Sequence, residues 1–125
     1  MILKPNSVPN KVIIAGGREF NDYDLLKTKC DSILSNLEDV IIISGDCRGT
    51  DKLGEKYAKE RGYKCEKYPA NWNEYGKVAG YIRNEEMAKI ATHLIAFWDN
   101  KSPGTKSMIN LGTKYNLKKR VIIYA

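Results

Sequence analysis

The stretch KVIIAGGREF at residues 11–20 decides the fold class, because a short aliphatic run ends there in a pair of glycines. A Val- and Ile-rich run of this length is typical of a strand buried on both faces of a sheet. The same order, an aliphatic run and then a glycine-containing turn, recurs in VIIISGDCRGTD at residues 40–51. Two such units in succession predict an α/β protein with a parallel sheet.

The rest of the chain continues this alternation of apolar runs and amphipathic stretches. Connections of this length predict parallel strands, right-handed crossovers and a three-layer sandwich with helices on both faces. We expect a five-stranded sheet in the order 3-2-1-4-5, with a ligand crevice at the carboxyl ends of strands 1 and 4, where the order reverses. The expected strands lie at residues 11–16, 39–44, 63–68, 93–98 and 119–124.

Four helices are expected in the connections. Asp22 is the predicted N-cap of the first helix, whose apolar face continues to Leu37. The second helix begins at residue 50 or 51 and ends at Arg61, before Gly62 as the C′ residue. The third and fourth helices are expected at residues 77–91 and 105–115.

Length and composition limit what this fold can be. With 125 residues, 42% of them hydrophobic, we expect a tail at residues 1–10 and a single domain at residues 11–125. The apolar runs are shorter than the roughly 20 residues that span a bilayer, and the first ten residues lack the apolar segment of a secretory signal. Three cysteines without a CxxC pair and one histidine favour neither a disulfide framework nor a metal site. We therefore expect a cytoplasmic protein with no metal or cofactor and no membrane association.

The formal net charge of +6 would attract polyanions at low salt. Along the sequence the basic residues occur singly, apart from the run at residues 118–120. This spacing favours a solvated basic surface over the concentrated stripe of a dedicated nucleic-acid binder.

Two glycine turns are expected to face each other across the crevice. Gly16 and Gly17, followed by Arg18, come after the first strand, and Gly104 and Thr105 open the last helix. Glycine lets a backbone approach a phosphate while its N–H groups point at the anion. A tight turn after a buried strand also favours glycine, so the first turn by itself supports both interpretations equally.

The turn after the second strand contains Ser44, Gly45 and Asp51 and matches neither GxGxxG nor GxxxxGK[ST]. One interpretation makes residue 50 or 51 an ordinary helix cap, and the other makes this turn part of a pocket wall. Both stay open from the sequence alone.

The third helix places two strong hydrogen-bonding groups, Arg83 and Asn84, among residues that must cover a sheet. The spacing of Ala79, Arg83, Met87 and Ile90 predicts one shared face, so the guanidinium is expected to point inward and to need an anionic partner. That partner is Asp46, Asp51 or a ligand phosphate. Before this helix, Trp72 and Tyr75 are expected in a loop, where they either stack on a ligand ring or seal an edge or subunit contact.

Four motifs occur here in a characteristic order and spacing: GGREF, SGDCRGTD, YGKVAGYIRNEEM after a tryptophan, and IAFWDNKSPGTKSM. Together they closely resemble the YspA-type, cpYpsA-related members of the SLOG superfamily, over about residues 11–121. Proteins of this kind occur in bacteria and phages. The resemblance implies a Rossmann-like fold that binds a nucleotide or nucleotide-derived molecule. The pocket it implies consists of Gly16, Gly17, Arg18, Ser44, Gly45, Asp51, Arg83, Asn84, Gly104 and Thr105, to which Trp72 is added as a stacking residue.

The superfamily also includes LOG-type nucleotide phosphoribohydrolases and the DNA-processing protein DprA, so three functions are weighed. Binding of a nucleotide for sensing or sequestration comes first. An N-glycoside hydrolase comes second, with Arg83, Asp51, Asp46 and Glu86 as the candidate catalytic residues. The carboxylate would come from one of these acids, because Met108 stands where the LOG-type signature has its catalytic Glu. Binding of single-stranded DNA, with aromatic rings as stacking platforms, comes last because the charge looks dispersed. A homo-oligomer, through the helix carrying Tyr81 or the last helix, is compatible with the sequence.

Overall fold

A computed structural model describes residues 8–124 and contains one sheet of five parallel strands in the order β3-β2-β1-β4-β5. The sequence-based prediction of an α/β fold with this strand order is confirmed. The first seven residues of the expected tail lie outside the described residues, and the first strand begins within the tail's expected range. The strands are β1 (Asn10–Gly16), β2 (Val40–Ser44), β3 (Lys64–Lys67), β4 (His93–Trp98) and β5 (Lys118–Ile123).

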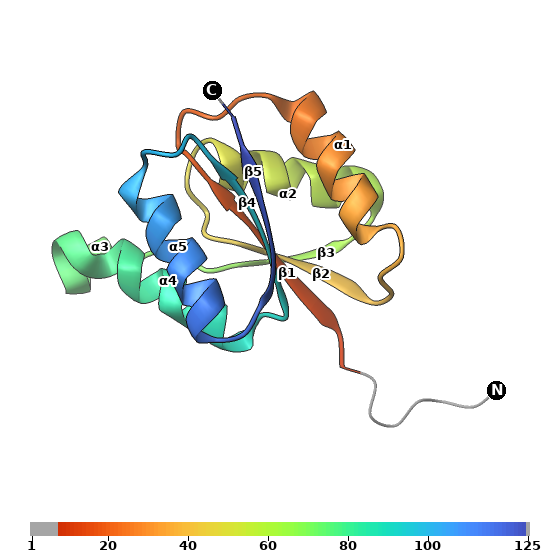
Figure 1. The fold of residues 1–125 in the computed structure, drawn as a ribbon. Helices are drawn as coiled ribbons and strands as arrows, with labels where there is room; N and C mark the ends of the chain where they lie inside the picture. Colours follow the sequence, from red (N-terminus) through yellow and green to blue (C-terminus); the bar gives the residue numbers. More distant parts are fainter. Residues whose placement is uncertain (1–7, 125) are drawn as a thin grey trace.

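Helices cover both faces of the sheet, as Figure 1 shows. On one face, α1 and α2 bury Leu26 and Tyr57 against residues such as Val12 of β1. On the other face, α4 and α5 bury Met87 and Met108 against the alternate residues of the same strands, such as Ile13. This alternation follows from the two-residue side-chain period of a strand. The helices are α1 (Tyr23–Leu34), α2 (Thr50–Arg61), α3 (Trp72–Tyr75), α4 (Ala79–Ile90) and α5 (Pro103–Lys114), with a 3-10 turn, η1, at Gly76–Val78.

Helix boundaries agree with the capping residues read from the sequence. The carboxylate of Asp22 accepts a hydrogen bond from the N–H of Leu25 (3.0 Å) at the start of α1. Gly62 ends α2 in the left-handed conformation, with φ 74°. In α2, however, the N-cap is Gly49, and Thr50 is already the first helical residue.

The segment before α4 differs from its prediction. The expected loop at Trp72 and Tyr75 is the short helix α3, and the expected third helix begins at Ala79 rather than at residue 77. Gly76, with φ 57°, separates α3 from the following turn, which explains the break. The prediction that Ile90 lies on the inward face of this helix is wrong, because the residue is 39% exposed to solvent.

The prediction that each strand is buried on both faces of the sheet is confirmed for the central strands but is wrong for the edge strands. Most residues of β3 and β5 are exposed or half-buried, because each edge strand has a neighbour on one side only. Within residues 8–124, the helices are all too short or too polar to cross a bilayer.

Candidate ligand-binding site

A cavity of about 440 Å³ opens at the carboxyl ends of β1 and β4, within the size range of small-molecule sites. It therefore lies at the switch point that the strand order predicts. One wall is formed by the turn after β1, the opposite wall by the start of α5, and the side by α3 and α4. Of the residues expected from the sequence, it brings together Gly16, Gly17, Arg18, Asp51, Trp72, Arg83, Asn84, Gly104 and Thr105.

Two other expected pocket residues lie behind this lining. The Ser44 hydroxyl donates to Glu55 (2.7 Å) and supports the chain from within. The Gly45 carbonyl accepts a hydrogen bond from Arg83 and so positions the guanidinium. The carboxylates of Asp46 and Glu86, considered for catalysis, also lie outside the lining.

Arg83 is the central cation of the cavity and is only 8% exposed. Its guanidinium donates to the carbonyls of Gly45 and Tyr68, and its Nε donates to Asn84 (2.9 Å). Within residues 8–124, no carboxylate oxygen lies within 4.0 Å of it. A buried charge without a counter-ion is costly, so this group favours an anion in the cavity.

Neither carboxylate considered as the partner of Arg83 forms that ion pair. Asp46 pairs instead with Lys52 on α2, which holds the pKa of this carboxyl below its usual range. Asp51 accepts a hydrogen bond from the N–H of Cys47 (3.1 Å). A ligand phosphate is the remaining partner of those predicted from the sequence.

Asp51 has an unusually high pKa for a carboxyl group. Burial raises its pKa to about 6, although the N–H of Cys47 and the charge of Arg83 both act in the opposite direction. Its side chain lines the cavity. The group therefore titrates near pH 6, and at neutral pH it is mostly ionised and can accept a proton beside a bound molecule.

The start of α5 leaves backbone donors free for an anion. Ser102 is the N-cap, but within the described chain its hydroxyl makes no capping bond and donates to Asp99 (2.9 Å) instead. The same Asp99 carboxylate accepts from the N–H groups of Lys101 and Ser102, which fixes the turn. N–H groups of a first helical turn lack partners within the helix, so those of Gly104 and Thr105 suit a phosphate.

Glycine occurs in the two facing turns for different physical reasons. A Cβ at Gly16 would collide with the carbonyl of Phe97, and one at Gly17 would collide with the Tyr124 hydroxyl. Packing therefore requires Gly16, which faces backbone, whereas at Gly17 only the end of the Tyr124 side chain would have to move. A Cβ at Gly104 would meet no atom within 4 Å among the described residues, so packing does not explain that glycine.

Sequence reasoning missed several lining residues, among them Cys47, Lys77 and Tyr81. Lys77 and Tyr81 lie at helical spacing from Asn84, so extending the face of Asn84 toward the N-terminus would have found them. Cys47 lies within a quoted motif, but its contact with Arg83 (3.7 Å) depends on the tertiary fold.

A parallel α/β sandwich with a cavity at the switch point and a buried arginine lining it defines the class as a Rossmann-like α/β protein. The family model for the YspA, cpYpsA-related SLOG family matches residues 10–75, more than half of the chain. The chain belongs to this family, which confirms the resemblance seen in its motifs.

The individual proteins similar to this chain share less than 30% of its sequence. The Gene 61 protein of Mycobacterium phage D29 is 28% identical over 106 residues, covering 77% of this chain and 82% of that protein. DNA processing protein A from Helicobacter pylori, studied for its single-stranded DNA binding mode, matches with a TM-score of 0.68 at 21% identity. This match covers 94% of our chain and 66% of that one, and it shows the fold alone. A predicted subunit of a tRNA methyltransferase from Methanocaldococcus jannaschii has a TM-score of 0.46 at 15% identity, covering 91% of our chain and 67% of that one, too distant to support an argument.

Proposed function

We propose that this protein binds a nucleotide or nucleotide-derived small molecule in the cavity at the carboxyl ends of β1 and β4, for sensing or sequestration. The observation that carries the proposal is Arg83, a buried cation that lines the cavity with no carboxylate within 4.0 Å among the described residues. Membership of a SLOG family supports a nucleotide-related ligand.

The lining divides into parts that suit the parts of a nucleotide. The phosphate would bind Arg83 and the N–H groups at the start of α5, with Arg18 at the mouth. The base would stack on Trp72 or Tyr81, whose side chains line the cavity and are about half exposed. When ionised, Asp51 would accept a ribose hydroxyl.

The test incubates the protein with mononucleotides, cyclic nucleotides and ADP-ribose derivatives and measures thermal stabilisation and bound mass. We expect stabilisation by at least one anionic member of the panel and its loss in Arg83→Ala, with an unchanged far-ultraviolet circular dichroism spectrum. Stabilisation that survives in Arg83→Ala would sink the assignment of the phosphate site.

A second variant is needed in case Arg83→Ala misfolds, because the Arg83 guanidinium also donates hydrogen bonds to two backbone carbonyls. Gly104→Ala adds one methyl group where the described residues leave space, so we expect an unchanged or slightly higher unfolding temperature. We also expect weaker stabilisation by the nucleotide, because the methyl group would hinder the approach of a phosphate. Full stabilisation in this variant would contradict a phosphate at the start of α5.

Asp51 favours a second candidate function, hydrolysis of an N-glycosidic bond. A carboxyl group with a pKa of about 6 in a cavity is suited to general acid–base chemistry near neutral pH. Mass spectrometry of the same incubations would detect free base and sugar phosphate, which Asp51→Asn should abolish. Recovery of every nucleotide intact would leave binding as the function.

A further inference from the structure

The whole excess of positive charge belongs to the last fifth of the sequence. Residues 1–99 contain fifteen Lys and Arg and fifteen Asp and Glu, whereas residues 100–125 contain six Lys and Arg and no Asp or Glu. These last residues form the end of the turn after β4, then α5 and β5. The linear spacing of basic residues suggests dispersed charge, but the fold gathers this segment at one edge of the sheet, where β5 is the outermost strand.

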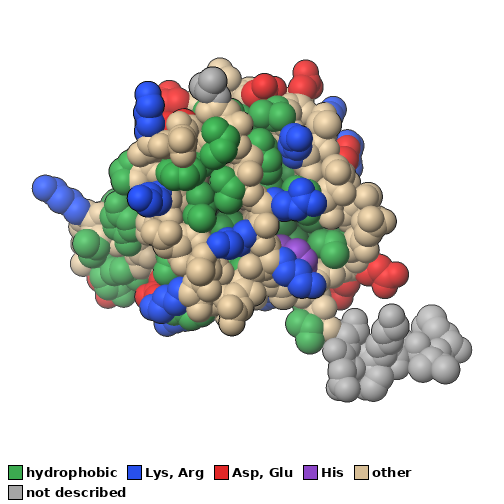
Figure 2. All heavy atoms as spheres, viewed as in Figure 1, with side chains coloured by type: hydrophobic (Ala, Val, Ile, Leu, Met, Phe, Trp, Pro, Cys, Tyr) green, Lys and Arg blue, Asp and Glu red, His purple; other side chains and the backbone are tan. Residues whose placement is uncertain are grey.

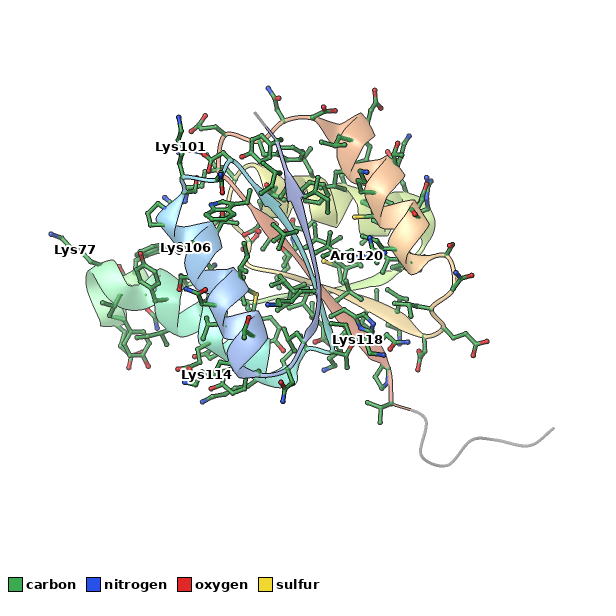
Figure 3. The ribbon with its side chains drawn as sticks, in the orientation of Figure 1. Lys77, Lys101, Lys106, Lys114, Lys118 and Arg120 are labelled. Atoms are coloured by element: carbon green, nitrogen blue, oxygen red, sulfur yellow. The ribbon has the colours of Figure 1, made fainter. Side chains whose placement is uncertain are left out.

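Five of these six side chains are labelled in Figure 3. Lys101, Lys106 and Lys114 lie just before or on α5, whereas Lys118 and Arg120 lie on the edge strand β5 and point toward the α1 side of the sheet. All five are exposed. In the same view, Figure 2 shows blue Lys and Arg side chains across the face, with red Asp and Glu side chains mainly at its rim. We call this surface the α5–β5 basic face, defined by Lys101, Lys106, Lys114, Lys118 and Arg120.

Intramolecular ion pairs do not account for this face. Among the described residues, only Lys114 of the five has a carboxylate within 4.0 Å, that of Glu85 at 2.9 Å. Uncompensated like charges on one surface repel each other and raise the potential there, which attracts polyanions.

A shallow groove runs along the outer side of α5 and has a volume of about 340 Å³. Lys106 and Lys114 lie along it, with the polar side chains of Ser107 and Asn110 between them. Pro103 lines both this groove and the ligand cavity, so the two are adjacent. The twelve residues of α5 span about 18 Å, the length of about five nucleotides at 3.4 Å each.

We propose that the α5–β5 basic face binds single-stranded nucleic acid, with the phosphate backbone following the groove along α5. Along the groove, cationic side chains are separated by hydrogen-bonding ones, and this pattern suits the repeating phosphates of a nucleic-acid backbone. Exposed rings of Trp72 and Tyr81 at the cavity, next to the groove, offer stacking surfaces that an unpaired base can use and a duplex cannot. Exposed positions of α5 such as Lys106 and Asn110 are polar, unlike the apolar face by which a helix enters a lipid surface.

The test compares two charge-reversed variants by fluorescence anisotropy with labelled oligothymidylate of about ten nucleotides. Lys106→Glu/Lys118→Glu changes the face, and Lys59→Glu/Lys64→Glu changes exposed lysines on α2 and the opposite edge strand, β3. Each double variant changes the formal net charge from +6 to +2. We expect the first to weaken binding at least tenfold and the second less than about threefold. Equal losses would show attraction by net charge alone and would overturn the proposal, as would the absence of binding by the unmodified protein.

Salt and competitors distinguish the class of partner. Three to five phosphate contacts predict a log–log slope of affinity against salt of about −2 to −3.5. Oligouridylate measured in parallel decides between RNA and DNA. Equal competition by a duplex of the same length, or by vesicles of phosphatidylcholine and phosphatidylserine, would overturn a single-strand site.

This proposal shares the rings of Trp72 and Tyr81 with the nucleotide cavity but does not depend on Arg83, so it can fail separately from the phosphate site. Arg83→Ala should lose nucleotide stabilisation but keep oligonucleotide binding, because Arg83 is buried away from the α5–β5 basic face. Loss of oligonucleotide binding in a folded Arg83→Ala protein would place the strand in the cavity and contradict the face as its site.

Discussion

Replacing Asp51 by asparagine should make the protein more stable at neutral pH and leave its stability unchanged in acid. The side chain is 9% exposed, and burial raises its pKa from 3.8 to about 6. The folded state thus binds a proton that the unfolded state releases between these two pH values. The contribution of Asp51 to stability is fully present below pH 3.8 and is lost as pH rises through about 6.

The size of the effect follows from the shift in pKa. About two pKa units at 1.36 kcal/mol each correspond to about 3 kcal/mol of free energy of unfolding above pH 7. With an unfolding entropy of about 2.1 cal/mol/K per residue, 125 residues convert this energy to about 11 °C in unfolding temperature. An asparagine side chain still offers an oxygen to the N–H of Cys47, so the local hydrogen bond is retained.

The assay is urea unfolding of the unmodified protein and of Asp51→Asn from about pH 3.5 to pH 8. Only the difference between the two curves is interpreted, which removes the contributions of other carboxyl groups. Glu38→Gln, which changes an exposed carboxyl, is the control and should show no such divergence. Parallel curves for the unmodified protein and Asp51→Asn across the whole range would refute the argument that burial raises the pKa of Asp51.

Three further outcomes are expected. Gly49→Ala should lower the free energy of unfolding, measured in urea, by about 2–4 kcal/mol. The reason is that φ is 79° at Gly49 and that a Cβ would collide with the backbone of the turn after β1. A loss below about 1 kcal/mol would contradict this. Asp31→Asn removes a half-exposed ion pair with Arg61, so we expect about 1 kcal/mol of destabilisation at pH 7. This difference should vanish as pH falls through about 2, where the carboxyl of Asp31 becomes protonated. A difference in stability that persists in strong acid would exclude the ion pair as its cause. If Trp72 stacks on the base, nucleotide addition should quench tryptophan fluorescence in the unmodified protein but not in Trp72→Phe, where Trp98 remains.

How far the sequence predicts this molecule depends on whether a feature is local or tertiary. The strands and the capping by Asp22 and Gly62 were readable because side-chain period and cap chemistry act within a few residues. The strand order, and with it the position of the cavity, followed from parallel crossover rules. The carbonyl partners of Arg83 were not readable, since Gly45 lies 38 residues away in the chain. The grouping of basic side chains along α5 and the edge strand β5 was not predicted for the same reason, although their separation from acidic residues is visible in the composition of residues 100–125.

Strand β5 closes the sheet at an exposed edge, where Val121 is 39% and Ile123 55% accessible to solvent. Unpaired edges with apolar side chains are sites at which sheets of separate molecules join and aggregate. Lys118, Lys119 and Arg120 occupy the first half of the same strand, and their mutual repulsion between molecules opposes such joining. At 1 M salt the Debye length shrinks to about 3 Å and this repulsion is screened. Colloidal stability of the protein should therefore be lowest in concentrated salt, where charge no longer protects the edge.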